Sequence, residues 1–319
     1  MAVLPPDPVF TLKQNDVGLI HCLCFPPTPE TRPPNRLLAG TEKGFLYIWS
    51  LDSNRVLNKI FIGNSLLSIQ HTDDKMITTL KSGEITVWNM ENECQYKELH
   101  KLESGPGFCR TILAQDKYIA TNQSNSTVEI YDFMSKLKVA SFVPDADSKF
   151  GNVMCLQHIN INENDYILSG YESGDLLLWD TKSSKTPLSQ LKLREFLTSM
   201  DFDIANYRGI CGNSSNYLQV FNLDRSLNLS LKCELSMTNN GSNVVKIRPD
   251  RKVFVSGGWD GFLRIYSWKS LRPLAVLTEH KGALCDITFS DRPVSSWKVK
   301  LMAAAGNDAQ ISLWDLYNN

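Results

Sequence analysis

The chain has 319 residues, with 33 Lys and Arg against 34 Asp and Glu, and 42% of its residues are hydrophobic. This near balance leaves no overall field that would favour nucleic acid or a membrane surface as a direct partner. No apolar run approaches the roughly 18 residues of a membrane helix, and the first residues lack the basic and apolar regions of a secretory signal.

Eight cysteines are scattered along the chain, mostly inside apolar runs: Cys22, Cys24, Cys94, Cys109, Cys155, Cys211, Cys233 and Cys285. Without a secretory signal we expect them to be reduced, buried thiols. The corresponding location is the cytoplasm and the nucleus.

One pattern repeats along the chain and is clearest in residues 255–268. A small-residue step is followed by a turn, Trp259 to Gly261, and then by an alternating run that ends on Tyr266. The same ending returns on seven aromatics, 39 to 48 residues apart: Trp49, Trp88, Tyr131, Trp179, Phe221, Tyr266 and Trp314. A period near 40–45 residues with four short strands per unit is typical of WD-type blades. The sequence therefore predicts an all-β fold, a seven-bladed WD40 β-propeller, as one domain over residues 1–319.

The blades expected in chain order span residues 18–63, 64–102, 105–145, 151–193, 196–236, 241–279 and 281–316. Within each blade the strands are short alternating or β-branched runs between turn residues. The first blade is interrupted by a surface loop at 26–36, which contains five prolines, and the seventh has a longer insert around 291–298.

The N-terminal segment 9–14 is a strand with no blade of its own, while the last blade shows only three strands. We therefore expect this strand to join the last blade as its outer edge and close the ring. Closure removes unpaired main-chain edges, which would otherwise be open to other chains.

The sequence contains no recognisable catalytic or metal-binding motif. Its five histidines form no pair with metal-ligand spacing, and Cys22-Leu-Cys24 has no matching second pair. A Gly-rich phosphate loop and a nucleophile elbow are also absent from the sequence. We expect a non-enzymatic protein with no cofactor.

In well-formed WD repeats a His, a Ser or Thr, an Asp and the closing Trp form a hydrogen-bonded tetrad. The seventh blade keeps His280, Asp308 and Trp314, but Ala304 stands where the hydroxyl residue is expected. The sixth blade keeps an Asp at 260 and ends in Tyr instead of Trp. These departures predict incomplete tetrads and reduced rigidity between strands.

Function in a propeller usually lies on its loops, and in WD repeats the residue before the turn Asp is exposed. Counting seven residues back from each closing aromatic gives Glu42, Lys81, Ser124, Glu172, Ser214, Trp259 and Asn307. Trp259 is the large apolar residue of this set, and tryptophan is enriched at binding hot spots. The alternative is that its ring folds over a neighbouring blade. The candidate partner-binding residues at these positions are Trp259, Glu172, Glu42, Lys81 and Asn307.

Three arginines complete the candidate partner-binding set. Arg248 and Arg251 belong to the turn 248–252, on the face opposite Trp259, where the alternative is a solvated polar turn without a partner. Arg110 interrupts an expected apolar strand at 108–113. It is expected to line the opening of the central channel or to pair with a buried carboxylate.

Several stretches identify a more specific resemblance: Gly107-Phe-Cys-Arg110, Ser169-Gly-Tyr-Glu-Ser-Gly174, Arg248-Pro-Asp-Arg-Lys252, Gly258-Trp-Asp260, Arg272-Pro-Leu-Ala-Val-Leu277 and Ile311-Ser-Leu-Trp-Asp-Leu-Tyr317. Together they resemble one branch of the WD-repeat proteins, the G-protein beta-subunit-like protein 1 family, whose fungal relative is the ASTRA-associated subunit. The matches lie in the third to seventh blades.

The resemblance implies a scaffold that acts in the co-chaperone-assisted maturation of phosphatidylinositol-3-kinase-related kinases, and through them in DNA-damage signalling. Its implied partners are the co-chaperone complex and the kinases. We expect no direct contact with nucleic acid or membrane, and a chain that is monomeric on its own.

Two other functions remain open at this point. WD-repeat substrate receptors of ubiquitin ligases often carry Trp-Asp-x-Arg, but the Trp-Asp pairs at 179 and 314 lack the arginine. A reader of peptides or histone tails needs an acidic or aromatic rim to its channel. Glu42, Glu172 and Trp259 fit such a rim, while Lys81 opposes it.

Overall fold

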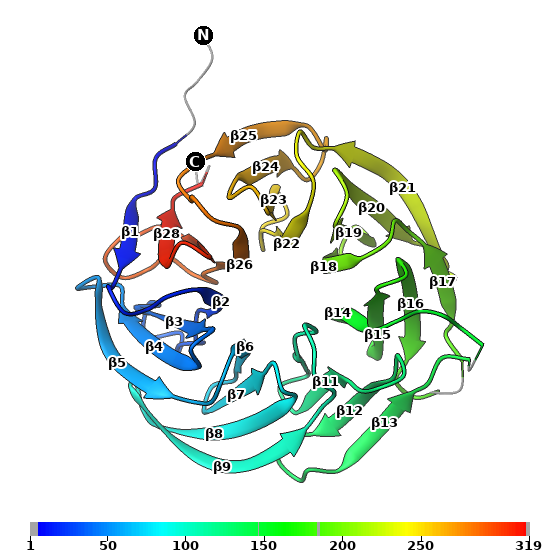
Figure 1. Cartoon of the computed structure of the whole chain (residues 1–319), viewed down its shortest axis with the longest axis horizontal. Helices are drawn as coiled ribbons and strands as arrows, with labels where there is room; N and C mark the ends of the chain where they lie inside the picture. The colour runs from blue at the N-terminus through cyan, green and yellow to red at the C-terminus, as the bar shows by residue number, and fades with distance from the viewer. Residues whose placement is uncertain (1–5, 146, 184–185, 317–319) are drawn as a thin grey trace. The chain divides into compact units, whose positions relative to one another are not determined.

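The computed structural model describes residues 6–145, 147–183 and 186–316. These residues form 28 strands and no helix, so none of them belongs to a helix that could cross a membrane. The strands build seven sheets of four strands each (Figure 1). The predicted fold class is confirmed: the protein is all-β, a seven-bladed β-propeller whose blades are these sheets.

The chain divides into two compact units, Met1–Lys101 with Arg248–Asn319, and Leu102–Ile247. The first unit contains β1 (Phe10–Lys13), β2 (Ile20–Cys24), β3 (Arg36–Thr41), β4 (Phe45–Ser50), β5 (Arg55–Phe61), β6 (Leu66–His71), β7 (Lys75–Leu80), β8 (Glu84–Asn92), most of β9 (Gln95–Glu103), β23 (Val253–Gly258), β24 (Leu263–Ser267), β25 (Pro273–Leu277), β26 (Leu284–Phe289), β27 (Met302–Gly306) and β28 (Gln310–Trp314).

The second unit contains β10 (Ile112–Ala114), β11 (Tyr118–Asn122), β12 (Val128–Asp132), β13 (Lys138–Phe142), β14 (Val153–Ile161), β15 (Asn164–Tyr171), β16 (Asp175–Asp180), β17 (Ser189–Lys192), β18 (Leu197–Asp203), β19 (Arg208–Asn213), β20 (Tyr217–Leu223), β21 (Leu229–Ser236) and β22 (Ser242–Ile247). The expectation of one domain over residues 1–319 stays a prediction.

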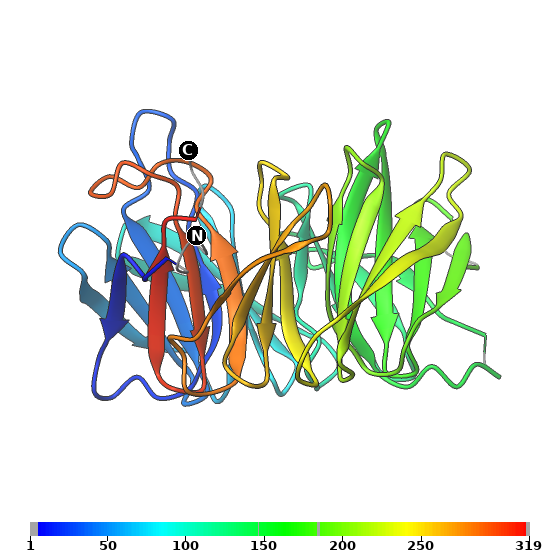
Figure 2. The same cartoon turned by 90° about the horizontal axis from the view of Figure 1, so that it is seen from above.

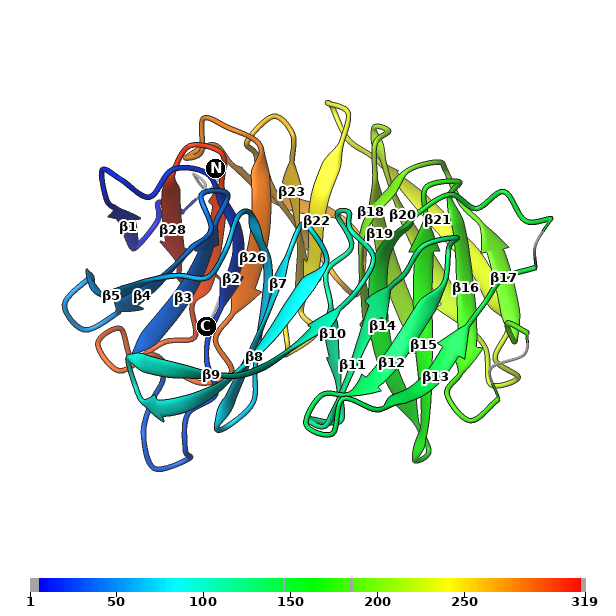
Figure 3. The ribbon, with the colours of Figure 1, turned by 60° about the horizontal axis from the view of Figure 1, so that its bottom comes forward.

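The N-terminal strand completes the last sheet, as the sequence predicted. β1 pairs antiparallel with β28, from Phe10 opposite Leu313 to Lys13 opposite Gln310. The strand order β1-β28-β27-β26 makes β1 the outer edge, and Figure 3 shows β1 beside β28. Leu12 is 1% exposed, so this strand contributes to the core as well as to the ladder.

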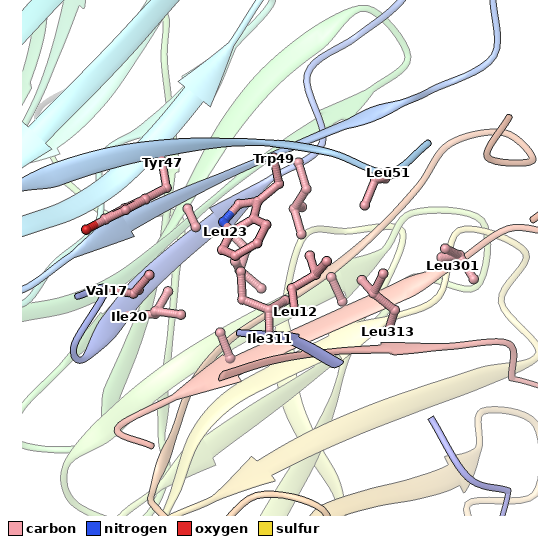
Figure 4. Close-up of a cluster of buried hydrophobic side chains, with 14 of the residues drawn as sticks. Leu12, Val17, Ile20, Leu23, Tyr47, Trp49, Leu51, Leu301, Ile311 and Leu313 are labelled. Atoms are coloured by element: carbon pink, nitrogen blue, oxygen red, sulfur yellow. The ribbon is translucent and has the colours of Figure 1, made fainter. Parts of the chain in front are cut away.

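The first and last blades share one apolar core (Figure 4). Trp49 of β4 and Leu23 of β2 lie in the same cluster as Leu313 of β28 and Leu12 of β1. Because both faces of a blade are covered by neighbours, the second strand of the first blade is buried at every position. Its run of apolar and small residues therefore shows no alternation of exposed side chains.

The tetrad of the seventh blade is complete, which corrects the expectation drawn from Ala304. His280 Nδ1 lies 3.0 Å from Asp308 Oδ1, and its Nε2 lies 2.7 Å from Ser312 Oγ. Trp314 Nε1 donates to the same Oγ at 2.7 Å. The hydroxyl comes from the third strand instead of the second, since Ser312 pairs directly with Ala304 across the ladder.

The closing tryptophans of two other blades find their hydroxyl on the second strand. Trp88 Nε1 donates to Thr78 at 2.8 Å, and Trp179 Nε1 donates to Ser169 at 2.8 Å. Trp49 Nε1, by contrast, is buried with no hydrogen-bond partner among the described residues. The predicted loss of tetrad bonding is thus real in the first blade and absent from the seventh.

All eight cysteines are free thiols, and Cys22, Cys109, Cys155 and Cys211 are buried. Burial raises the pKa of Cys155 to about 12. A thiol that stays protonated is a poor nucleophile and a poor metal ligand, so this side chain packs as a small apolar group.

Candidate partner-binding surfaces

The register counted from the closing aromatics is correct. Each of the seven positions follows the second strand of its sheet directly or by one residue more, in the hairpin that leads to the third strand. Five of them are exposed and two are half-buried, Glu172 and Ser214. Whether these positions bind partners stays a prediction.

Trp259 projects from a turn that is fixed from below by an ion pair. Its residue is 45% exposed. Arg264, 5% exposed, donates from Nη2 to Asp260 Oδ2 at 2.6 Å and from Nη1 to Asp260 Oδ1 at 3.1 Å. Phe262 N also donates to Asp260 at 3.0 Å. The carboxylate therefore holds both the turn and the buried guanidinium, and presents Trp259 on a rigid support.

The turns of Trp259 and Asn307 lie against one connecting loop, residues 280–282. Gly261 has φ +82, and a Cβ there would lie 2.7 Å from the carbonyl oxygen of His280. A Cβ on Gly282 would lie 3.1 Å from the Cβ of Asn307. Glycine is thus required for the turns to approach this closely, and the structure brings these two candidates into one neighbourhood.

Glu42 and Lys81 are linked in a similar way through Ser65. Ser65 N donates to Glu42 O at 2.9 Å, and Lys81 N donates to Ser65 O at 2.9 Å. Both side chains are exposed. Their backbones are therefore fixed relative to each other, and their charges are opposite.

Glu172 is half-buried and its side chain already has a structural partner. Its Oε2 accepts from Asn152 N at 2.7 Å, and its carbonyl oxygen accepts from Phe196 N at 2.7 Å. The carboxylate therefore orders the loop before β14 in addition to any role at the surface.

Two exposed aromatic residues of the second unit are not among the candidates that the sequence predicted. Phe196 is 45% exposed, has φ +59, and lies beside Glu172 through the backbone bond just described. Phe108 is 62% exposed. Phe108 carried a signal, because it lies in a stretch that resembles a family motif, whereas Phe196 carried none.

Arg110 lies outside a strand, which corrects the expected strand at 108–113. β10 is limited to Ile112–Ala114, and Arg110 is half-exposed in the irregular segment before it. Gly107, at φ +143, and the bond between Thr111 and Thr121 hydroxyls at 3.2 Å shape this segment. The backbone thus joins the sheet only after the arginine.

Arg248 is buried, so the picture of a solvated turn is wrong for this residue. It is 5% exposed and donates from Nε and Nη2 to the two oxygens of Asp250 at 2.8 Å each. Its Nη1 donates to the carbonyl oxygen of Leu316. Burial raises the pKa of Asp250, but the bonds and charge of Arg248 outweigh burial and leave that pKa below its usual value. Arg251, at φ +60, is the exposed arginine of this turn.

Within the described ranges, no three His, Cys, Asp or Glu side chains gather in a way that could hold a metal ion. The candidate positions next to the second strands lie in hairpins that present one large aromatic side chain, Trp259, and several charged or amide side chains.

Comparison with known proteins adds to this picture. Residues 231–267 match the WD40 family, described as "WD domain, G-beta repeat". Guanine nucleotide-binding protein subunit beta-like protein 1 of Mus musculus is 30% identical over 328 residues, which cover 98% of this chain and 97% of that protein.

Proteins named ASTRA-associated protein 1 are also similar. The one from Schizosaccharomyces pombe is 40% identical over 77 residues, 24% of this chain and 19% of that protein. The one from Verticillium alfalfae is 22% identical over 391 residues, 96% of this chain and 92% of that protein.

Proposed function

The chain belongs to the family of guanine nucleotide-binding protein subunit beta-like protein 1, and we propose that it is a non-enzymatic adaptor in the maturation of phosphatidylinositol-3-kinase-related kinases. The observation that carries the proposal is the likeness along 98% of this chain and 97% of the relative. Similarity over nearly the whole length of both proteins supports a shared role, whereas similarity confined to one repeat would support only a shared fold.

The partners in this proposal are the co-chaperone complex and the kinases themselves. Relatives named ASTRA-associated protein 1 are named for an association with ASTRA, and we carry an association with such an assembly over to this chain. The adaptor then works in the cytoplasm and the nucleus and contributes to DNA-damage signalling.

We assign the partner contact first to the turn of Trp259, together with Asn307. A rigid aromatic loses little conformational entropy when it is covered, so most of the apolar area that it buries contributes to affinity. The Asp260–Arg264 pair supplies the rigidity.

Affinity purification of the tagged chain from cells tests the proposed function. The expected result is recovery of the kinases and of their co-chaperone complex. Recovery of neither contradicts the proposal, and recovery of ubiquitin-ligase subunits or histone tails in their place supports the alternative functions.

Trp259→Ala tests the proposed surface. We expect partner affinity to fall by about 2 kcal/mol or more, roughly thirtyfold, as is usual for a tryptophan hot spot. The thermal midpoint should change by no more than a few degrees, since the side chain is 45% exposed.

Phe61→Ala is the matched control, because Phe61 is a 58% exposed aromatic on the outer strand β5. Partner recovery should be unchanged in this variant. A large loss of thermal stability in Trp259→Ala would instead show that the indole is packing, and the surface would then be assigned wrongly.

A further inference from the structure

Two segments, 248–273 in the sixth blade and 290–300 in the insert of the seventh, carry an excess of positive charge in a chain whose net charge is −1. The segments 248–273 and 290–300 contain nine Lys and Arg but only three acidic residues. Each of the three acids is already paired with an arginine within these segments: Asp250 with Arg248, Asp260 with Arg264, and Asp291 with Arg292. Arg251, Lys252, Lys269 and Arg272 take part in none of these three pairs.

Four exposed cations form what we call the basic end: Arg251, Lys252, Lys269 and Arg272. They come from two turns, β22–β23 and β24–β25, which antiparallel pairing places at the same end of the sheet, opposite the turn of Trp259. A backbone bond from Trp268 N to Lys252 O ties the two turns together, and one from Ser267 N to Arg272 O closes the second turn, at 2.9 Å each. Within the described part of the chain, no ion pair joins any of the four cations to an acid.

The buried Arg248 fixes the first of these turns. Its bonds to Asp250 and to the carbonyl oxygen of Leu316 anchor the turn to the last blade. A small hollow beside it is lined by Arg248, Asp250 and Lys300 and by the apolar side chains of Phe289, Met302 and Leu316. The cations are thus presented on an ordered backbone, which reduces the entropy lost when a ligand binds.

Exposed aliphatic side chains continue from the basic end along the outer strand β25. Leu274 is 48% exposed and Val276 is 42% exposed, two and four residues after Arg272. The aromatic residues of the adjoining strand and turn, Tyr266 and Trp268, are 5% and 1% exposed. The rings of Tyr266 and Trp268 are therefore closed to base stacking, and β25 offers aliphatic groups beside the cations.

We propose that the basic end binds an acidic segment of a partner protein, in which carboxylates face the four cations and aliphatic side chains cover Leu274 and Val276. Charge complementarity assigns the acid, and the aliphatic neighbours assign a polypeptide, because a polynucleotide has no aliphatic side chains to bury. The surface is separate from the turn of Trp259, so it does not depend on which assembly that turn binds.

The test measures fluorescence anisotropy of a labelled peptide of eight glutamates followed by Leu-Gly-Val, titrated with the full chain. The variant is Arg251→Ala, Lys252→Ala, Lys269→Ala and Arg272→Ala together. We expect its affinity to be at least about tenfold below that of the unaltered chain. The affinity of the unaltered chain should also fall as salt rises from about 50 to about 300 mM, because exposed charges are screened.

The control variant removes four other exposed cations of the same unit: Lys13→Ala, Lys43→Ala, Arg55→Ala and Lys97→Ala. It has the same net charge as the test variant and should bind the peptide within about twofold of the unaltered chain. An equal loss in both variants would overturn the assignment to the basic end.

Three further measurements separate the remaining explanations. If the variant with all four substitutions has a lowered thermal midpoint, the double variant Arg251→Ala and Arg272→Ala replaces it. Its affinity for the peptide should be about threefold below that of the unaltered chain. Tighter binding of a single-stranded oligonucleotide or of phosphatidylserine vesicles, lost in the same variant, would overturn the acidic-peptide class. Trp259→Ala should bind the peptide as tightly as the unaltered chain does. Failure of the basic end to bind an acidic peptide is therefore distinguishable from failure of the proposed adaptor function.

Discussion

At the residue scale, the closing tryptophans show how one hydrogen-bonding requirement is met in different ways. In two blades the indole donates to a hydroxyl on the second strand, Thr78 or Ser169. In the seventh blade the indole of Trp314 donates to Ser312 on its own strand, and the same hydroxyl is hydrogen-bonded to His280. What is required is an acceptor at the indole nitrogen, and two backbone positions can place one there.

Ala39→Ser should stabilise the protein by roughly 0.5–1.5 kcal/mol, because it supplies the acceptor that the buried Trp49 Nε1 lacks. Ala39 pairs with Tyr47 across β3 and β4, as Ser169 pairs with Leu177 in the fourth blade. Urea unfolding measures the change. In a Trp49→Phe background the gain should vanish; an equal gain in both backgrounds would rule out the proposed bond.

At the scale of elements, loops of the first blade and the insert of the seventh hold one another. Arg292 donates to the carbonyl oxygens of Thr28 and Pro29, and the hydroxyls of Ser295 and Ser296 both donate to Asp52. Figure 2 shows the two longer loops, residues 26–36 in blue and 290–301 in orange to red, projecting beyond the strands at the same end. Segments whose prolines and polar residues predict only loops are thus hydrogen-bonded to each other, and they connect the first blade to the seventh.

Leu12→Ala tests the closing strand. Leu12 is 1% exposed and pairs with Ile311, so truncation should cost about 2–5 kcal/mol in the free energy of unfolding. Chemical denaturation measures this loss. Lys13→Ala, at the exposed next position of β1, should change stability by no more than about 0.5 kcal/mol. Similar effects for both variants would mean that β1 does not complete the last sheet in solution.

At the scale of the whole molecule, one buried histidine links stability to pH. Burial lowers the pKa of His71 to about 4. The neutral ring donates from Nδ1 to the carbonyl oxygen of Thr72 and accepts at Nε2 from the hydroxyl of Tyr96, at 3.0 Å. A second proton would remove the acceptor that Tyr96 uses, so the folded state favours the neutral form.

Acidification should therefore destabilise the protein through His71. The unfolded chain takes up this proton near pH 6.5, while the folded chain resists it down to about pH 4. His71 thus contributes stability above about pH 6.5, and about 3 kcal/mol of it is lost as the pH falls to about 4. Free energies of unfolding measured across this range should show a shallower slope for His71→Gln. A slope equal in His71→Gln and in the unaltered chain would contradict this role of His71.

The sequence by itself determined most of the strands, the sevenfold repeat and the closing role of residues 9–14, because alternation, turn residues and repeat length are local properties of a chain. It also placed Trp259 at the tip of its hairpin, since that position is counted along one blade. Tertiary structure alone decided that Arg248 is buried and that Ser312 completes a tetrad. It also decided that Phe196 is exposed and that two turns combine into a basic end. These features depend on contacts between segments far apart in the chain, and no local pattern records which groups those contacts bury, pair or leave open.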